Sequence, residues 1–162
     1  MQLEQRDKEL AAIGSAIGCN CRPCVDYHIP KGREAGLSEA ELAEAVATAR
    51  AVRDHGIELL APRIDQLLGR GSEGDCGELA PVAATSRPHA LVCLGASVGV
   101  NSHPLLERHI VAALEFGLTP TEVTAAIKMA SFVQARAGEI TAEKAKHALD
   151  QLAGVATSEP AG

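Results

Sequence analysis

Three cysteines and one histidine lie within ten residues near the start of the chain, in the segment CNCRPCVDYH at residues 19–28. Cys21 and Cys24 are spaced C-x-x-C, a spacing that in proteins lowers the pKa of one thiol and makes it nucleophilic. His28 follows Cys24 by four residues, so on a helix its imidazole lies over the same face, within hydrogen-bond reach of the sulfur. The segment therefore predicts thiol chemistry in which the imidazole accepts the thiol proton or holds the thiolate.

The same side chains leave a second interpretation open. Cys19, Cys21, Cys24 and His28 are all ligand types that zinc accepts, although a closed tetrahedron requires Cys19 to fold back if the rest is helical. The chain also contains an internal repeat, in which the apolar residue Val100 stands at the position of Cys19. We therefore expect Cys19 to pack against the core. A zinc-binding or assembly module thus stays an alternative, while our leading interpretation includes no metal and no cofactor.

The thiol chemistry depends on a helix that begins at these cysteines. A helix is predicted over residues 22–35, ending at Gly36, because glycine is favoured at the left-handed position that follows a helix. The free N–H groups of the first turn and the positive end of the helix dipole stabilise a thiolate at Cys21 or Cys24. Arg22 adds a cation at the same end of the helix.

Two further helices flank this one. The first is predicted from Leu10, Ile13 and Ile17, which have the i, i+3, i+7 spacing of a buried stripe. The other opens with a capping box formed by Ser38 and Glu41. No segment shows a sustained alternation with a period of two, and the alanine-rich composition favours helix. The predicted fold class is therefore all-α.

The chain contains an internal repeat, in which the second copy is shifted from the first by half the length of the chain. Residues 9–49 match residues 90–130 without a gap, and 13 of the 41 positions are identical. The identical pairs include Gly14 with Gly95, Gly18 with Gly99, Asn20 with Asn101, Pro23 with Pro104, His28 with His109, Gly36 with Gly117 and Glu41 with Glu122. Chance similarity between helices does not keep glycines, a proline and a histidine in one register, so we interpret the repeat as a duplication.

The second copy lacks the residues that carry the chemistry of the first. The positions of Glu9, Cys21 and Cys24 are occupied there by Ala90, Ser102 and Leu105. Redox chemistry by the same mechanism is thereby excluded in the second copy, which we interpret as a structural half. His109 is predicted to be a packing residue retained from the duplication, and Cys93 to be buried and inert.

The repeat predicts how the chain is organised. We expect a redox-active copy over residues 1–68, a Gly-rich linker over residues 69–88, a degenerate copy over residues 89–156 and a disordered tail over residues 157–162. Cys76 lies in the linker and is predicted to be a free, exposed thiol. Since a domain as small as one half of this chain has little net stability alone, the two copies are expected to pack together.

Composition narrows the range of partners. The chain has 162 residues and a formal net charge of −6, which weighs against a nucleic-acid or anionic-membrane partner. No stretch approaches the ~20 apolar residues of a membrane span, and the N-terminus has no apolar signal core. Five cysteines, three of them close together, do not suggest an extracellular disulfide framework. These observations predict a soluble cytoplasmic protein.

Glu9, Cys21, Cys24 and His28 together match the pattern E-x11-C-x2-C-x3-H of the alkylhydroperoxidase D-like branch of the carboxymuconolactone decarboxylase superfamily. The resemblance covers residues 9–52, and the second copy resembles a degenerate version of the same module. It implies an all-helical fold, assembly into trimers or hexamers, and thiol-dependent peroxidase or disulfide reductase chemistry. A fused pair of modules would then form a homotrimer with pseudo-sixfold contacts.

The resemblance also implies roles for the four residues. In the family's scheme the positions of Glu9 and His28 form a proton relay that activates the cysteine matching Cys24. Its thiolate attacks a hydroperoxide, the resulting sulfenic acid is resolved as a disulfide by the cysteine matching Cys21, and an external dithiol reduces that disulfide. Pro23 stands where some members have a further histidine, so a shorter relay is expected. A lactone-acting enzyme like the superfamily's name-giving members, which work without the cysteine pair, is the other alternative.

Overall fold

The computed structural model describes residues 3–70 and 83–156, and within these two ranges every regular element is an α-helix. The all-α prediction is thus confirmed. The helices are α1 (Gln5–Gly18), α2 (Arg22–Glu34), α3 (Glu39–Glu58), α4 (Leu60–Leu67), α5 (Arg87–Gly99), α6 (His103–Phe116) and α7 (Pro120–Ala156). Helix α5 begins inside the predicted linker, whereas Cys76 and the tail 157–162 lie outside the described residues.

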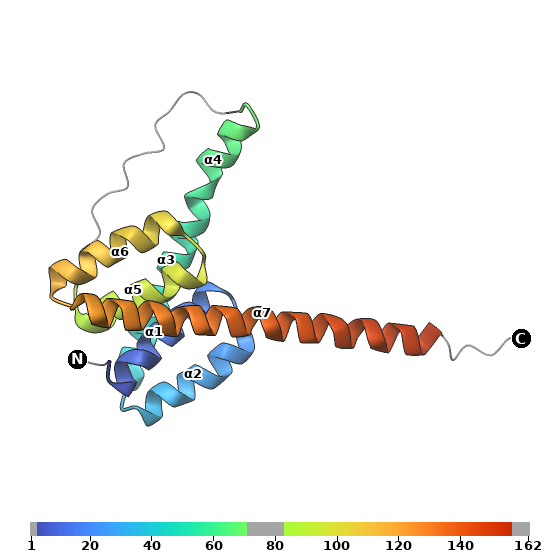
Figure 1. Ribbon diagram of the computed structural model, residues 1–162, viewed down its shortest axis with the longest axis horizontal. Helices are drawn as coiled ribbons and strands as arrows, with labels where there is room; N and C mark the ends of the chain where they lie inside the picture. Colours follow the sequence, from blue (N-terminus) through green and yellow to red (C-terminus); the bar gives the residue numbers. More distant parts are fainter. Residues whose placement is uncertain (1–2, 71–82, 157–162) are drawn as a thin grey trace, which may run out of the picture.

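Helices α1 and α5 lie against each other in the middle of the body, and α3 and α7 both pack on this central pair (Figure 1). Their approach is close enough to require glycine. A Cβ atom on Gly95 would lie 2.1 Å from the carbonyl oxygen of Ala11, and one on Gly14 would lie 2.4 Å from that of Val92. The two central helices therefore touch through their backbones, with the apolar core around them.

The helices of the two halves correspond along the chain. The start of α6 follows that of α2 by half the length of the chain, and the start of α7 follows that of α3 by the same shift. The second residue after the end of each central helix recurs as well. Asn20 has a φ of 54° and Asn101 a φ of 58°, both in the left-handed region. We propose on this basis that both halves derive from one module.

Two features of the fold were not predicted. The sequence predicted three helices per copy, but α4 follows α3 as a fourth, with Leu60, Ile64 and Leu67 on one exposed face. Helix α7 continues for 37 residues, so that its distal part projects beyond the other helices (Figure 1). Every helix in the described part of the chain is too short or too polar to cross a membrane.

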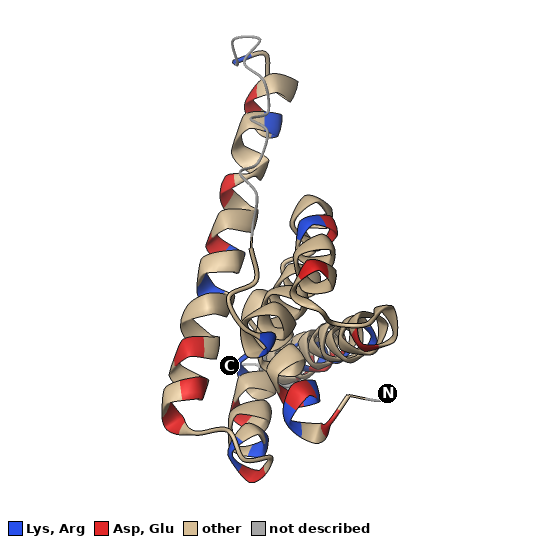
Figure 2. Cartoon of the chain, turned by 90° about the vertical axis from the view of Figure 1, so that its left-hand side faces the viewer, with Lys and Arg blue, Asp and Glu red and all other residues tan. Residues whose placement is uncertain are grey.

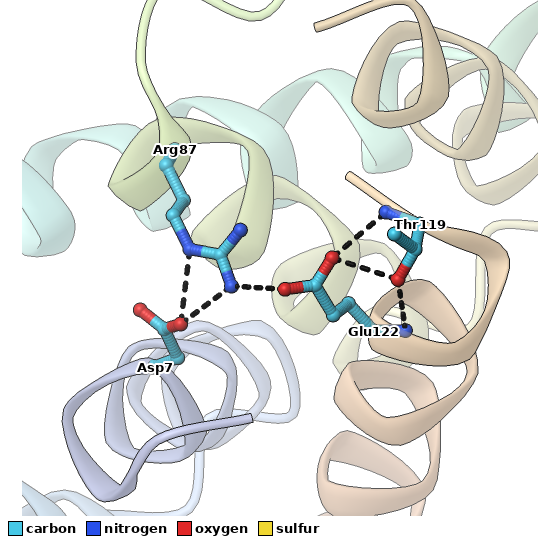
Figure 3. Close-up of polar contacts among 4 residues, drawn as sticks. All are labelled: Asp7, Arg87, Thr119 and Glu122. Carbon is cyan, nitrogen blue, oxygen red and sulfur yellow. Dashed lines mark hydrogen bonds and ion pairs between the residues drawn. The ribbon is translucent and has the colours of Figure 1, made fainter. Parts of the chain in front are cut away.

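Figure 2 shows that the outer helices α3 and α4 carry both acidic and basic residues along their length. One partly exposed arginine joins three helices. Arg87, at the start of α5, donates hydrogen bonds to Asp7 of α1 at 2.7 and 3.0 Å and to Glu122 of α7 at 2.8 Å (Figure 3). Glu122 also accepts hydrogen bonds from the backbone and hydroxyl of Thr119, each 2.8 Å long. The capping box of α7 is thereby tied to both central helices.

Replacing Arg87 with methionine is expected to lower the free energy of unfolding by about 2 kcal/mol at pH 7, because two nearly buried carboxylates lose their cation. The expected loss is below that of a fully buried pair, since the Arg87 side chain is 37% exposed. Urea denaturation of both proteins, followed by circular dichroism, measures the difference.

At acidic pH, the difference in unfolding free energy between wild type and Arg87→Met should become smaller. The hydrogen bonds from Thr119, followed by that from Arg87, lower the pKa of Glu122 from 4.5 to about 2. A carboxylate with a lowered folded-state pKa stabilises the fold above its unfolded pKa, and this contribution is lost as the pH falls through the folded pKa. The stability difference between wild type and Arg87→Met should therefore shrink between pH 4.5 and about pH 2. An equal difference at pH 7 and pH 2 would contradict this assignment.

Candidate functional site

Cys21 and Cys24 form a disulfide at the start of α2, with Cα atoms 5.2 Å apart. Cys21 is the N-cap residue, and the backbone N–H of Cys24 donates a hydrogen bond of 3.2 Å to its sulfur. Pro23, within the first turn, has no N–H to leave unpaired, so it suits this place. The predicted helix start is right, and the two sulfurs lie where N–H groups and the helix dipole favour negative charge.

Glu9 of α1 and His28 of α2 meet beside the disulfide. The Nδ1 atom of His28 lies 2.8 Å from Oε2 of Glu9, and both residues are more than nine-tenths buried. The side-chain amide of Gln5, one turn earlier on α1, donates a hydrogen bond of 2.7 Å to the other carboxylate oxygen. An ionised carboxylate only accepts, so the Nδ1–H of His28 donates to Glu9 and leaves Nε2 as the reactive nitrogen.

A pocket of about 510 Å³, which we call the cysteine pocket, opens beside these groups. It is lined by Gln5, Glu9, Pro23, Cys24, Tyr27, His28, Met129, Phe132, Val133, Arg136 and Ile140. In the described part of the chain, each buried side-chain nitrogen or oxygen either has a hydrogen-bond partner or touches open space. Nε2 of His28 has no such partner there, so it faces open space beside Cys24.

One wall of the cysteine pocket comes from the other half of the chain. Met129, Phe132, Val133, Arg136 and Ile140 belong to α7, which crosses over α1 and the start of α2. The cysteine pocket is therefore formed by residues of both halves of the chain. An apolar stripe on a helix does not show which half of the molecule it covers, so these residues were not predicted to belong to the site.

Cys19, the other candidate ligand, lies apart from this chemistry. Cys19 is partly buried, and its thiol points to the carbonyl oxygen of Ala16, 3.6 Å away. Burial raises the pKa of the Cys19 thiol. The alternative zinc set is thus not assembled, and no three His, Cys, Asp or Glu residues of the described ranges are grouped to hold a metal. Tyr27 is exposed at the pocket, with its ring edge-on to that of His28 at 5.0 Å.

The arrangement permits two-electron thiol chemistry. Cys24 lines the pocket and Cys21 lies behind it at the helix cap, so a molecule in the pocket reaches Cys24 first. The neighbouring imidazole can give or take a proton through Nε2, while Glu9 holds Nδ1 and fixes the orientation of the ring. The disulfide joins the two sulfurs at the N-terminus of α2.

The sequence profile of the carboxymuconolactone decarboxylase family matches residues 2–61. The match covers α1, α2 and α3, and with them all four residues of the E-x11-C-x2-C-x3-H pattern. Comparisons with curated proteins and with solved structures found no match.

Proposed function

We propose that this chain, which over residues 2–61 belongs to the carboxymuconolactone decarboxylase family, is a thiol-dependent oxidoreductase that reduces a hydroperoxide or a disulfide. The observation that carries the proposal is the Cys21–Cys24 disulfide, whose Cys24 lines the same pocket as the His28–Glu9 pair. A peroxidase and a disulfide reductase share this machinery, and both consume one external dithiol per turnover.

With a hydroperoxide, the reaction starts from the reduced pair. The Cys24 thiol gives its proton to Nε2 of His28, and the thiolate attacks the terminal peroxide oxygen. The O–O bond breaks, Cys24 becomes a sulfenic acid, and the departing alkoxide takes the proton from His28 and leaves as an alcohol. The Cys21 thiol then attacks the Cys24 sulfur, water leaves, and the disulfide forms. An external dithiol returns the pair to two thiols by exchange.

The proposal is tested by giving the reduced protein one equivalent of cumene hydroperoxide without a reductant. One equivalent of alcohol should appear, together with a mass loss of two hydrogens located by peptide mapping to Cys21 and Cys24. Protein alkylated at both thiols should be inactive. Hydroperoxide reduction that survives alkylation of both thiols would contradict the proposal.

Glu9→Gln should lower kcat for dithiol-dependent hydroperoxide reduction by about 10²-fold or more, the usual range for loss of acid–base catalysis. The amide can still accept the Nδ1–H of His28, but it lacks the negative charge that stabilises the imidazolium. Steady-state kinetics with a fixed dithiol measures the change. The Cys21–Cys24 disulfide should still form on slow oxidation, so a variant that cannot form it would point to misfolding.

We also propose that the protein is a homotrimer, as the resemblance implies, in which apolar residues exposed in the single chain become covered. On the distal part of α7, Leu149 and Leu152 are 67% and 68% exposed, and on α4 Leu67 is 69% exposed. Such helix faces are stabilised when another helix covers them. Light scattering at micromolar concentration should give three times the chain mass, and a monomer would contradict the proposal.

A further inference from the structure

A second pocket, which we call the His109 pocket, lies on the other half of the molecule. It measures about 420 Å³ and is formed by α3, α5 and α6. Six of its lining residues occupy the positions that line the cysteine pocket, shifted by half the length of the chain. Leu105, His109, Thr48, Ala51, Val52 and His55 correspond to Cys24, His28, Met129, Phe132, Val133 and Arg136. The two pockets are therefore equivalent places in the two halves.

The histidine of the second pocket is held in one tautomer. The hydroxyl of Ser97 donates its only hydrogen to the carbonyl oxygen of Cys93 at 2.8 Å. Ser97 Oγ also lies 2.7 Å from Nδ1 of His109, so it must accept the hydrogen of that nitrogen. Nε2 of His109 consequently carries a lone pair. In the described ranges, every side-chain nitrogen that is closed off from open space has a hydrogen-bond partner. Nε2 of His109 has no such partner there, so it faces the open space of the pocket.

The partner of the imidazole distinguishes the two pockets. Nδ1 of His28 lies against the carboxylate of Glu9, whereas Nδ1 of His109 lies against the neutral hydroxyl of Ser97. Burial, followed by the nearby charges of His89, Arg108 and His55, lowers the pKa of His109 to about 4. The ring is thus neutral at pH 7 and acts as a hydrogen-bond acceptor rather than a base. Burial also raises the pKa of the Cys93 thiol to about 12, so this sulfur is not a nucleophile.

We propose that the His109 pocket is a non-catalytic binding site for small apolar alcohols, whose hydroxyl donates a hydrogen bond to Nε2 of His109. The walls contributed by Ala51, Val52 and Leu105 are apolar and suit a hydrocarbon body. A neutral acceptor takes an uncharged O–H donor, and the nearby guanidinium of Arg108 disfavours an organic cation. This inference rests on the second pocket alone and does not depend on thiol chemistry in the first.

The test uses 2-phenyl-2-propanol and its methyl ether, which differ in the O–H group. Nitrogen NMR of the ring-labelled protein, with His109 assigned by substitution, should show a saturable shift of its Nε2 resonance with the alcohol. The ether should leave that resonance in place. The variant Ala51→Trp, at an exposed position of the pocket wall, should lose the response, and Cys24→Ser should keep it.

A second variant measures the hydrogen bond itself. His109→Phe keeps a planar ring but removes the acceptor, and Ser97 still has its hydrogen bond to Cys93. Calorimetric affinity for the alcohol at this pocket should fall about 3- to 10-fold, the value of one hydrogen bond. Equal responses to alcohol and ether, or a response that persists in Ala51→Trp, would overturn the proposal. Zn²⁺ that shifts Nε2 of His109 where the alcohol does not would likewise overturn it.

Discussion

Replacing Cys24 with serine is expected to abolish dithiol-dependent hydroperoxide turnover, down to the rate of the uncatalysed reaction. Serine has nearly the same shape, but its hydroxyl stays protonated beside an imidazole and does not attack peroxide oxygen as a thiolate does. The fold should remain, because the residue is small, lies in the first turn of α2, and only loses a sulfur–sulfur bond. Peroxide consumption, measured with excess dithiol, gives the result.

The matched control is Cys19→Ser, which alters a thiol five residues away that is turned toward a backbone carbonyl. It should keep wild-type turnover. The variant Cys21→Ser separates the attack on the peroxide from the formation of the disulfide. In this variant Cys24 should still be oxidised once, to a sulfenic acid that dimedone traps. Full activity in Cys24→Ser would refute the assignment of this sulfur as the attacking one.

Gly95→Ala is expected to lower the free energy of unfolding by more than about 3 kcal/mol, beyond the usual cost of an extra methyl group in a core. The added Cβ would lie 2.1 Å from the carbonyl oxygen of Ala11, so the helix backbones must separate. Separation would also disturb the core that holds α1, and with it the position of Glu9. Thermal and urea denaturation measure the loss of stability.

Gly138→Ala provides the control within the same fold. Gly138 lies in α7, and a Cβ there would meet no atom within 4 Å. Because alanine favours helix over glycine, this variant should gain about 0.5–1 kcal/mol. If both substitutions changed stability equally, the close approach of α1 and α5 would not be the reason that glycine is needed at residue 95.

The sequence alone predicted the parts of the site that are local. The start of α2 at Cys21 and the capping box of Ser38 follow from preferences that act over a few residues, and both are found in the structure. The contact between Glu9 and His28 came only from a family resemblance, because no local rule relates residues on two different helices. Gln5, which fixes the carboxylate of Glu9, was missed for the same reason.

Such local rules do not predict how α3 and α7, the third helix of each copy, pack against the rest of the molecule. A stripe such as Met129 and Val133 predicts that a face of α7 is buried, but not that it covers the cysteines of the other half. His109 was predicted to be a packing residue. It is buried as expected, but its Nε2 atom faces a pocket. The sequence could not predict this, because it does not show that Ser97 is the partner of Nδ1.

The crossing of α7 onto the first half has a consequence for how the site responds to dilution. If the two halves were separate polypeptides, the wall containing Phe132 and Arg136 would reach the disulfide only in an associated pair, and the fraction of complete sites would fall at low protein concentration. In one chain, the covalent connection holds that wall at an effective local concentration in the millimolar range. The cysteine pocket is therefore complete in every folded chain, however few copies the solution contains.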